Sequence, residues 1–78
     1  MKYKICKYDR AYCIQVEGCG IVAFHYGHVS SRWYYLHKSS MADGYGWDVC
    51  SALDSLVTTG TSIDAIENVI IPAIKERS

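Results

Sequence analysis

The chain has 78 residues, of which half are hydrophobic and 21% are charged. The length suits one domain, residues 1–78, and the composition excludes a disordered chain. No run approaches the roughly 20 apolar residues of a membrane span, and the first residues lack the apolar segment of a secretory signal. We therefore expect a cytoplasmic protein (in the host cell cytoplasm if it is phage-encoded) whose cysteines are free thiols.

Charge is unevenly distributed along the chain, although the formal net charge is zero. Residues 1–38 hold six basic and two acidic side chains, which gives a net charge of +4. Residues 39–78 hold two basic and six acidic side chains, which gives −4. The two halves could simply attract each other, or the folded protein could present a polarised surface that steers a charged partner.

Residues 2–8 and 11–17 predict two strands that a two-residue loop joins into a hairpin. That loop length places Cys6 opposite Cys13. Because side chains alternate between the two faces of a strand, the apolar positions fall together on one face. This predicted core face comprises Tyr3, Ile5, Tyr12, Ile14 and Val16.

Two further strands are predicted at 21–26 and 32–38. A glycine-containing turn of three residues pairs Ile14 with Phe24, and a five-residue loop pairs Phe24 with Tyr34. The face opposite the core is then apolar and aromatic, where a half-exposed sheet should be polar. This predicted outer face comprises Ile21, Ala23, His25, Trp33, Tyr35 and His37.

Two helices are predicted after the strands. The first spans about 48–59, and the second begins at Thr61 or Ser62, which are suitable N-cap residues. Pro72 should bend the second helix. Its apolar stripe comprises Ile63, Ile66, Val69, Ile70, Ala73 and Ile74. The predicted fold class is therefore α+β: an antiparallel β-meander of three to four strands, residues 2–38, followed by two α-helices packed on one face of the sheet.

Cysteine and histidine supply the residue types of a metal site or of a nucleophilic enzyme. These residues are Cys6, Cys13, Cys19, His25, His28, His37 and Cys50. The chain has no Cys-x-x-Cys, and His25-x-x-His28 stands alone, so the spacing departs from known zinc patterns. Cys19 is the most exposed thiol by position, but nothing places a base beside it. We expect no enzyme activity, no cofactor and no metal, with a small zinc-stabilised domain as an alternative.

An apolar, aromatic outer face is typical of a protein-binding surface, because interface cores are enriched in Tyr, Trp and Arg. The predicted partner-binding residues are Trp33, Tyr35, His25, His37, Ile21 and Arg32. The expected partner is a larger protein or ribonucleoprotein complex, with a homodimer as an alternative and no membrane. Replacing Trp33 and Tyr35 with alanine should then abolish binding with little loss of stability.

A platform for RNA or single-stranded nucleic acid is the other alternative. Aromatic rings on the outer face would stack on bases, and basic side chains would neutralise phosphates. Those basic residues are Lys2, Lys4, Arg32 and Lys38. The zero net charge and the acidic second half of the chain disfavour this alternative.

In its size and character the chain resembles the small stand-alone proteins of phages and mobile elements, such as anti-CRISPR inhibitors. The resemblance covers no specific motif, so it assigns no residue of this sequence. It implies a protein that acts without catalysis by occupying a site on a larger assembly. The expected function is therefore that of a non-catalytic inhibitor that binds and blocks a larger macromolecular complex.

Overall fold

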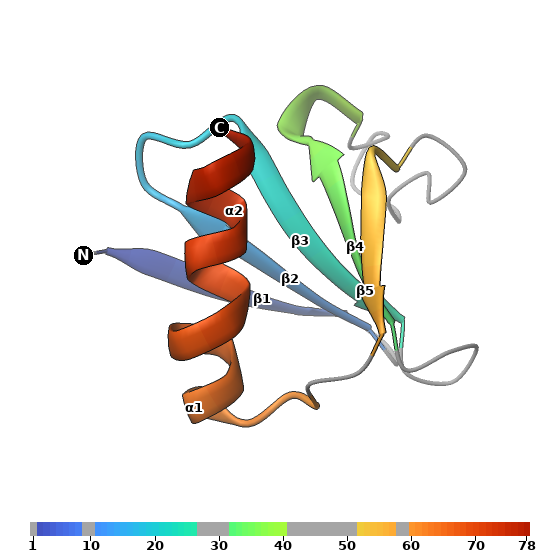
Figure 1. Ribbon diagram of the computed structural model, residues 1–78, viewed down its shortest axis with the longest axis vertical. Helices are drawn as coiled ribbons and strands as arrows, with labels where there is room; N and C mark the ends of the chain where they lie inside the picture. The colour runs from blue at the N-terminus through green and yellow to red at the C-terminus, as the bar shows by residue number, and fades with distance from the viewer. Residues whose placement is uncertain (1, 9–10, 27–31, 41–51, 58–59) are drawn as a thin grey trace.

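A five-stranded antiparallel sheet with one helix on one of its faces forms the fold (Figure 1). The computed structural model describes residues 2–8, 11–26, 32–40, 52–57 and 60–78. The strands lie in sequential order: β1 (Tyr3–Tyr8), β2 (Ala11–Val16), β3 (Ile21–Tyr26), β4 (Arg32–His37) and β5 (Asp54–Val57). A short 3-10 turn, η1 (Lys38–Ser40), follows β4. The α+β class and the antiparallel meander are thus confirmed.

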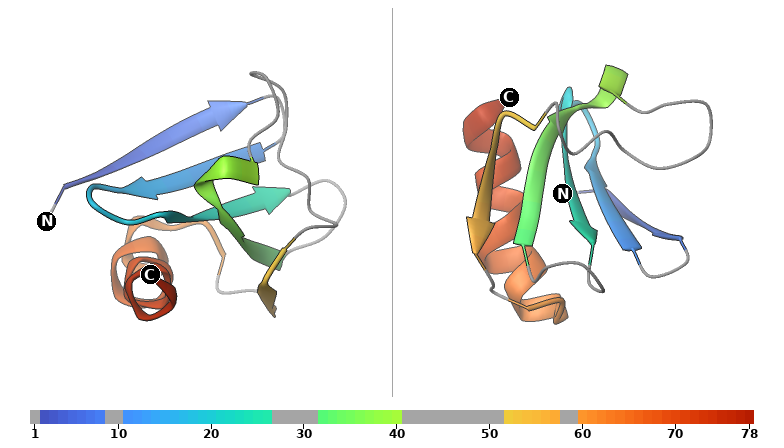
Figure 2. Two further views of the ribbon diagram at one scale, coloured as in Figure 1. Left: turned by 90° about the horizontal axis from the view of Figure 1, so that it is seen from above. Right: turned by 90° about the vertical axis from the view of Figure 1, so that its right-hand side faces the viewer.

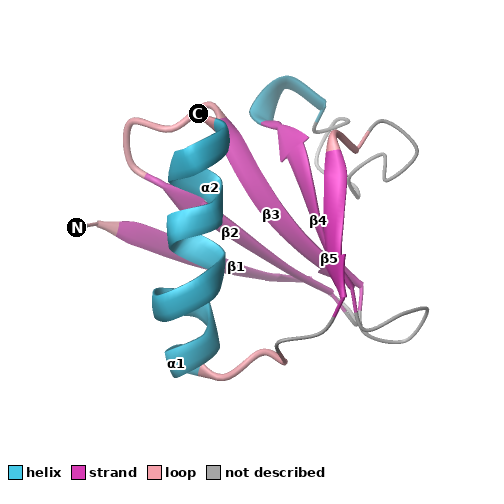
Figure 3. Ribbon diagram, viewed as in Figure 1, coloured by secondary structure: helices cyan, strands magenta, loops and turns pink. Residues whose placement is uncertain are grey.

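One continuous helix of 15 residues ends the chain (Figure 3). It comprises α1 (Ile63–Ala65), a π-helical turn η3 (Ile66–Ile70) and α2 (Ile71–Arg77). Its N-cap is Ser62, whose hydroxyl accepts a hydrogen bond from the backbone N–H of Ala65 at 3.2 Å, as the sequence predicts. None of the described helical segments has the length and apolar character needed to cross a membrane.

The helix predicted at 48–59 is wrong where the structure describes it. Residues 54–57 form β5, which pairs with β4 so that Leu56 lies opposite Trp33. The predicted positions 48–51 and 58–59 lie outside the described residues. The apolar spacing of this segment suits a helix, but pairing with a strand far away in the sequence overrides that local preference. The described sheet therefore has five strands where the sequence predicts three to four, and the described residues form one helix where it predicts two.

Two of the three predicted strand registers are confirmed and one is wrong. Cys6 lies opposite Cys13, and Phe24 lies opposite Tyr34. Between β2 and β3, however, Ile14 lies opposite Ala23 and not opposite Phe24. The connection is the four-residue segment 17–20, one residue longer than predicted, and its Gly18 adopts a left-handed φ of 83°.

The single-residue shift exchanges the faces of β3 and β4 relative to those of β1 and β2. The predicted outer face of β3 and β4 therefore lies beneath the helix, which covers one side of the sheet (Figure 2). This helix-side core comprises Ile14, Val16, Ile21, Ala23, Trp33, Tyr35, Ile66, Ile70, Ile71 and Ile74. A far-side core on the opposite face comprises Ala11, Cys13, Val22, Phe24 and Leu36.

The π-helical turn accommodates Pro72. A proline inside an α-helix lacks the N–H of one hydrogen bond, and its ring clashes with the carbonyl four residues earlier. Here the wider turn ends at Ile70, two residues before the proline, and the N–H of Ile71 donates to the carbonyl of Ile66. The turn brings Ile66 and Ile71 to the same side, where both are buried. Two members of the predicted stripe are instead exposed, Ile63 by 54% and Val69 by 37%.

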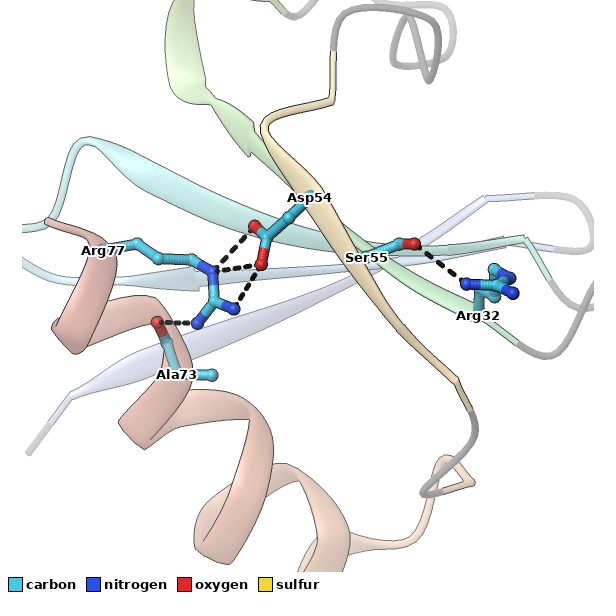
Figure 4. A network of polar contacts seen from close by, with 5 residues as sticks. All are labelled: Arg32, Asp54, Ser55, Ala73 and Arg77. Carbon is cyan, nitrogen blue, oxygen red and sulfur yellow. Dashed lines mark hydrogen bonds and ion pairs between the residues drawn. The ribbon is translucent and has the colours of Figure 1, made fainter.

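Arg77 fixes the end of the helix to the edge strand β5 (Figure 4). Its Nε donates to both carboxylate oxygens of Asp54, at 2.8 and 3.1 Å, and its Nη2 donates to the same carboxylate. Its Nη1 donates to the carbonyl of Ala73 at 2.9 Å, and the guanidinium lies 4.1 Å from the ring centroid of Tyr35. The hydrogen bonds from Arg77 lower the pKa of Asp54, but solvent screening limits such an exposed pair to about 1 kcal/mol.

Candidate binding surface

The six predicted partner-binding residues do not form an exposed patch. Four of them are buried: Ile21, His25, Trp33 and Tyr35. Trp33 and Tyr35 have no exposed surface at all, because the β2–β3 register turns them towards the helix. The exposure expected of these four residues is therefore wrong. Arg32 and His37 are exposed and remain accessible to a partner.

Trp33 is held in the helix-side core by specific contacts. Its Nε1 donates to the carbonyl of Gly60 at 3.0 Å, and its ring lies 5.0 Å from that of His25 between centroids. The His25 ring lies 6.5 Å from that of Tyr12 on its other side. The Nδ1 atom of His25 is buried without a hydrogen-bond partner in the described part of the chain, and burial lowers the pKa of His25. These contacts assign Trp33 and His25 to the core.

Acidification should destabilise the protein through His25. The pKa of this imidazole is lower in the folded state than its ordinary value of 6.5, so the unfolded state takes up the proton first. The contribution of neutral His25 to stability is complete above about pH 6.5 and falls as the pH drops from there towards the folded-state pKa. Thermal melts between about pH 7.5 and about pH 5 should show a falling Tm, and His25→Phe should remove much of that fall.

The exposed His37 provides the control for this experiment. His37→Gln should leave the fall in Tm below about pH 6.5 in place, because the side chain lies outside the core. A His25→Phe protein that melts with the pH dependence of the wild type would contradict this role of the buried imidazole.

The buried thiol of Cys13 lacks the surroundings of a nucleophile, and the described residues form no metal-binding cluster. Burial raises the pKa of Cys13 to about 12, so this thiol is protonated at neutral pH. Its cross-strand neighbour Cys6 accepts a weak hydrogen bond from Gln15 Nε2 at 3.9 Å. In the segments that the structure describes, no three His, Cys, Asp or Glu residues lie close enough together to hold a metal ion. The other candidate ligands His28 and Cys50 lie outside these segments.

An open pocket lies at the end of the sheet where β1 begins and where β2 and β4 end. It has a volume of about 350 Å³, and three of its lining side chains are lysines: Lys2, Lys4 and Lys38. The turn after β2 lines it with Glu17 and Cys19. We call this site the lysine pocket.

Backbone hydrogen bonds explain why the lysine pocket forms. The N–H of Glu17 donates to the carbonyl of Lys2 at 3.0 Å, which fixes the start of β1 beside the turn. The N–H of Lys38 donates to the carbonyl of Gly20 at 2.8 Å, which brings the end of β4 to the same turn. Lysines that are 34 or more residues apart in the sequence thus converge, because strand pairing is antiparallel throughout the described sheet.

The charge of the lysine pocket is not neutralised within the described part of the protein. Three lysines face one glutamate there, and none of these lysines forms an ion pair with a described carboxylate. Lys2, Lys4 and Lys38 are all exposed. Uncompensated ammonium groups around a concave surface favour an anionic ligand or partner.

Comparison of the chain with protein-family models, with curated proteins and with solved structures finds no match. Function is therefore inferred from the geometry and charge of this chain alone.

Proposed function

We propose that the protein is a non-catalytic binding module that occupies a site on a larger protein or ribonucleoprotein complex and blocks it, in the manner of anti-CRISPR inhibitors. The observation that carries this proposal is the lysine pocket, where three exposed ammonium groups face one carboxylate, that of Glu17, and form no ion pair with a described carboxylate. Such a cluster favours an acidic protein surface, since complementary potentials steer association and suppress wrong partners.

The partner contact differs from the one that the sequence suggests. Trp33 and Tyr35 are core residues, so they are not available to a partner while the helix remains on the sheet. The lysine pocket instead supplies positive charge, and the exposed His37 lies at the end of β4 beside it. The exposed Arg32 begins the same strand and so lies at its other end, where its Nη1 donates to Ser55 Oγ at 3.1 Å. Protein recognition is favoured over nucleic acid, because single-strand binding needs exposed rings and these two rings are buried.

Charge reversal in the lysine pocket should abolish partner binding. The test variant combines Lys2→Glu, Lys4→Glu and Lys38→Glu, and the matched control is Lys75→Glu on the exposed side of the helix. A partner is captured with the wild-type protein from an extract of the native host, identified by mass spectrometry and purified. Its affinity should fall at least about tenfold for the pocket variant and stay unchanged for the control.

Two results would count against the proposal. Equal affinity of the pocket variant and of the wild-type protein for the purified partner would exclude the lysine pocket as the binding site. Tight, strongly salt-dependent binding of a single-stranded oligonucleotide, lost in the pocket variant, would instead support the nucleic-acid alternative.

A further inference from the structure

The strand β1 is an edge strand of the described sheet. In the described sheet β2 is its neighbour on one side and no strand lies on the other, so β1 forms the margin of the ribbon in Figure 1. The hydrogen bond from Glu17 N–H to the Lys2 carbonyl fixes which backbone groups face β2. Because backbone groups alternate in direction along a strand, those of Tyr3, Ile5 and Lys7 point away from the sheet.

We propose that β1 is a docking strand, to which an extended acidic segment of a partner protein adds as a further antiparallel or parallel strand. The segment would pair with the outward backbone groups of β1 and place carboxylates beside its lysines. This inference rests on the proposed function, because it states how the acidic partner of the lysine pocket is held. Strand addition gives affinity through backbone hydrogen bonds and specificity through side chains.

Charge complementarity along β1 favours an acidic occupant. Lys2, Lys4 and Lys7 are all exposed, and the first two also line the lysine pocket. The ammonium group of Lys7 lies 5.8 Å from the ring centroid of Tyr12 on β2, so positive charge extends beyond the pocket. Opposite charges on neighbouring strands stabilise a sheet, whereas like charges destabilise it.

The same lysines disfavour a second copy of this chain as the occupant. If two β1 strands paired in antiparallel fashion about Ile5, no lysine would lie directly opposite another, but Lys4 of one copy would be the diagonal neighbour of Lys4 of the other on the same face. Like charges at such short separation would repel. Lysines are a common protection of edge strands against pairing with themselves. The lysines therefore disfavour pairing of β1 with β1 of a second copy, whereas they favour pairing with a negatively charged segment.

Amide hydrogen exchange tests the docking strand directly. The probe is a capped peptide in which glutamate alternates with valine, and its matched control has glutamine in place of glutamate. With the acidic peptide bound to the labelled protein, exchange should slow at the outward amides of Tyr3, Ile5 and Lys7. The glutamine peptide should bind at least about tenfold more weakly. Exchange at these amides could instead be slow without peptide and become slower as the protein concentration rises. That result would overturn the proposal, because it would mean that β1 pairs with a second copy of the chain.

A pair of variants at Lys7 separates backbone pairing from charge. Both Lys7→Pro and Lys7→Ala remove the ammonium group, but only proline removes the outward N–H. Lys7→Pro should bind the acidic peptide at least about tenfold more weakly than Lys7→Ala. Equal binding by the two variants, or unchanged exchange at the three outward amides of the wild-type protein, would overturn strand addition.

These outcomes also distinguish the two proposals. If the purified partner needs the pocket lysines but leaves the outward amides of β1 unprotected, strand addition is wrong and the proposed function stands. If the charge-reversed pocket has no effect on the partner, the proposed function fails first and strand addition fails with it.

Discussion

Replacing Trp33 with alanine should lower the free energy of unfolding by about 3–5 kcal/mol. The side chain has no exposed surface, and its removal would leave a cavity between the helix and the sheet. It would also leave the carbonyl of Gly60 without the indole N–H that now donates to it. A chain of 78 residues has a total stability of roughly 4–12 kcal/mol, so this single change removes much of it.

Urea denaturation followed by circular dichroism measures this loss. The matched control is His37→Ala, an exposed position at the end of the same strand, which should change stability by no more than about 0.5 kcal/mol. If Trp33→Ala instead abolished partner binding with less than about 1 kcal/mol of destabilisation, Trp33 would be a contact residue and its position in the core would be wrong.

Replacing Ile70 with alanine should cost about 2–5 kcal/mol of stability. Ile70 has no exposed surface and lies in the π-helical turn, in the core that joins the helix to the sheet. The adjacent Val69 is 37% exposed, so Val69→Ala should cost less than about 1 kcal/mol. The same denaturation experiment compares the two variants. Similar losses for both would mean that the helix does not pack through the face that carries Ile70.

The sequence predicts the local parts of this fold well. The registers of β1 with β2 and of β3 with β4 follow from loop length and alternation, and both are confirmed. The N-cap at Ser62 follows from its position before an apolar stripe, and it is also confirmed. Each of these features depends on residues that are near one another in the chain.

The register between β2 and β3 could not be predicted from the apolar pattern. Ile21 and Ala23 face one side of the strand while Val22 and Phe24 face the other, and all four are buried. A strand that is apolar on both faces fits either register, so the length of the glycine turn decides between them. A three-residue turn aligns the apolar residues in the predicted register, but the protein uses a four-residue connection. The outer face predicted for β3 and β4 is wrong for the same reason, because it depends on the register between β2 and β3.

The candidate site was only partly visible in the sequence. Lys2, Lys4 and Lys38 are named there as phosphate-neutralising residues, and the positive charge of residues 1–38 is the signal that identifies them. Their convergence on one pocket depends on the turn at 17–20, which the predicted register misplaces. The edge position of β1 was implied by the meander, whereas β5 at the other edge was not, because its pairing with β4 is non-local.

The position of β3 at the centre of the sheet affects how the protein unfolds. Its residues contribute in alternation to the core under the helix and to the core on the opposite face, so the two layers share one backbone. Loss of β3 would remove both layers at once, so we expect this strand to open only in global unfolding. A substitution that destabilises β3 from one face of the sheet should therefore also weaken the core on the opposite face.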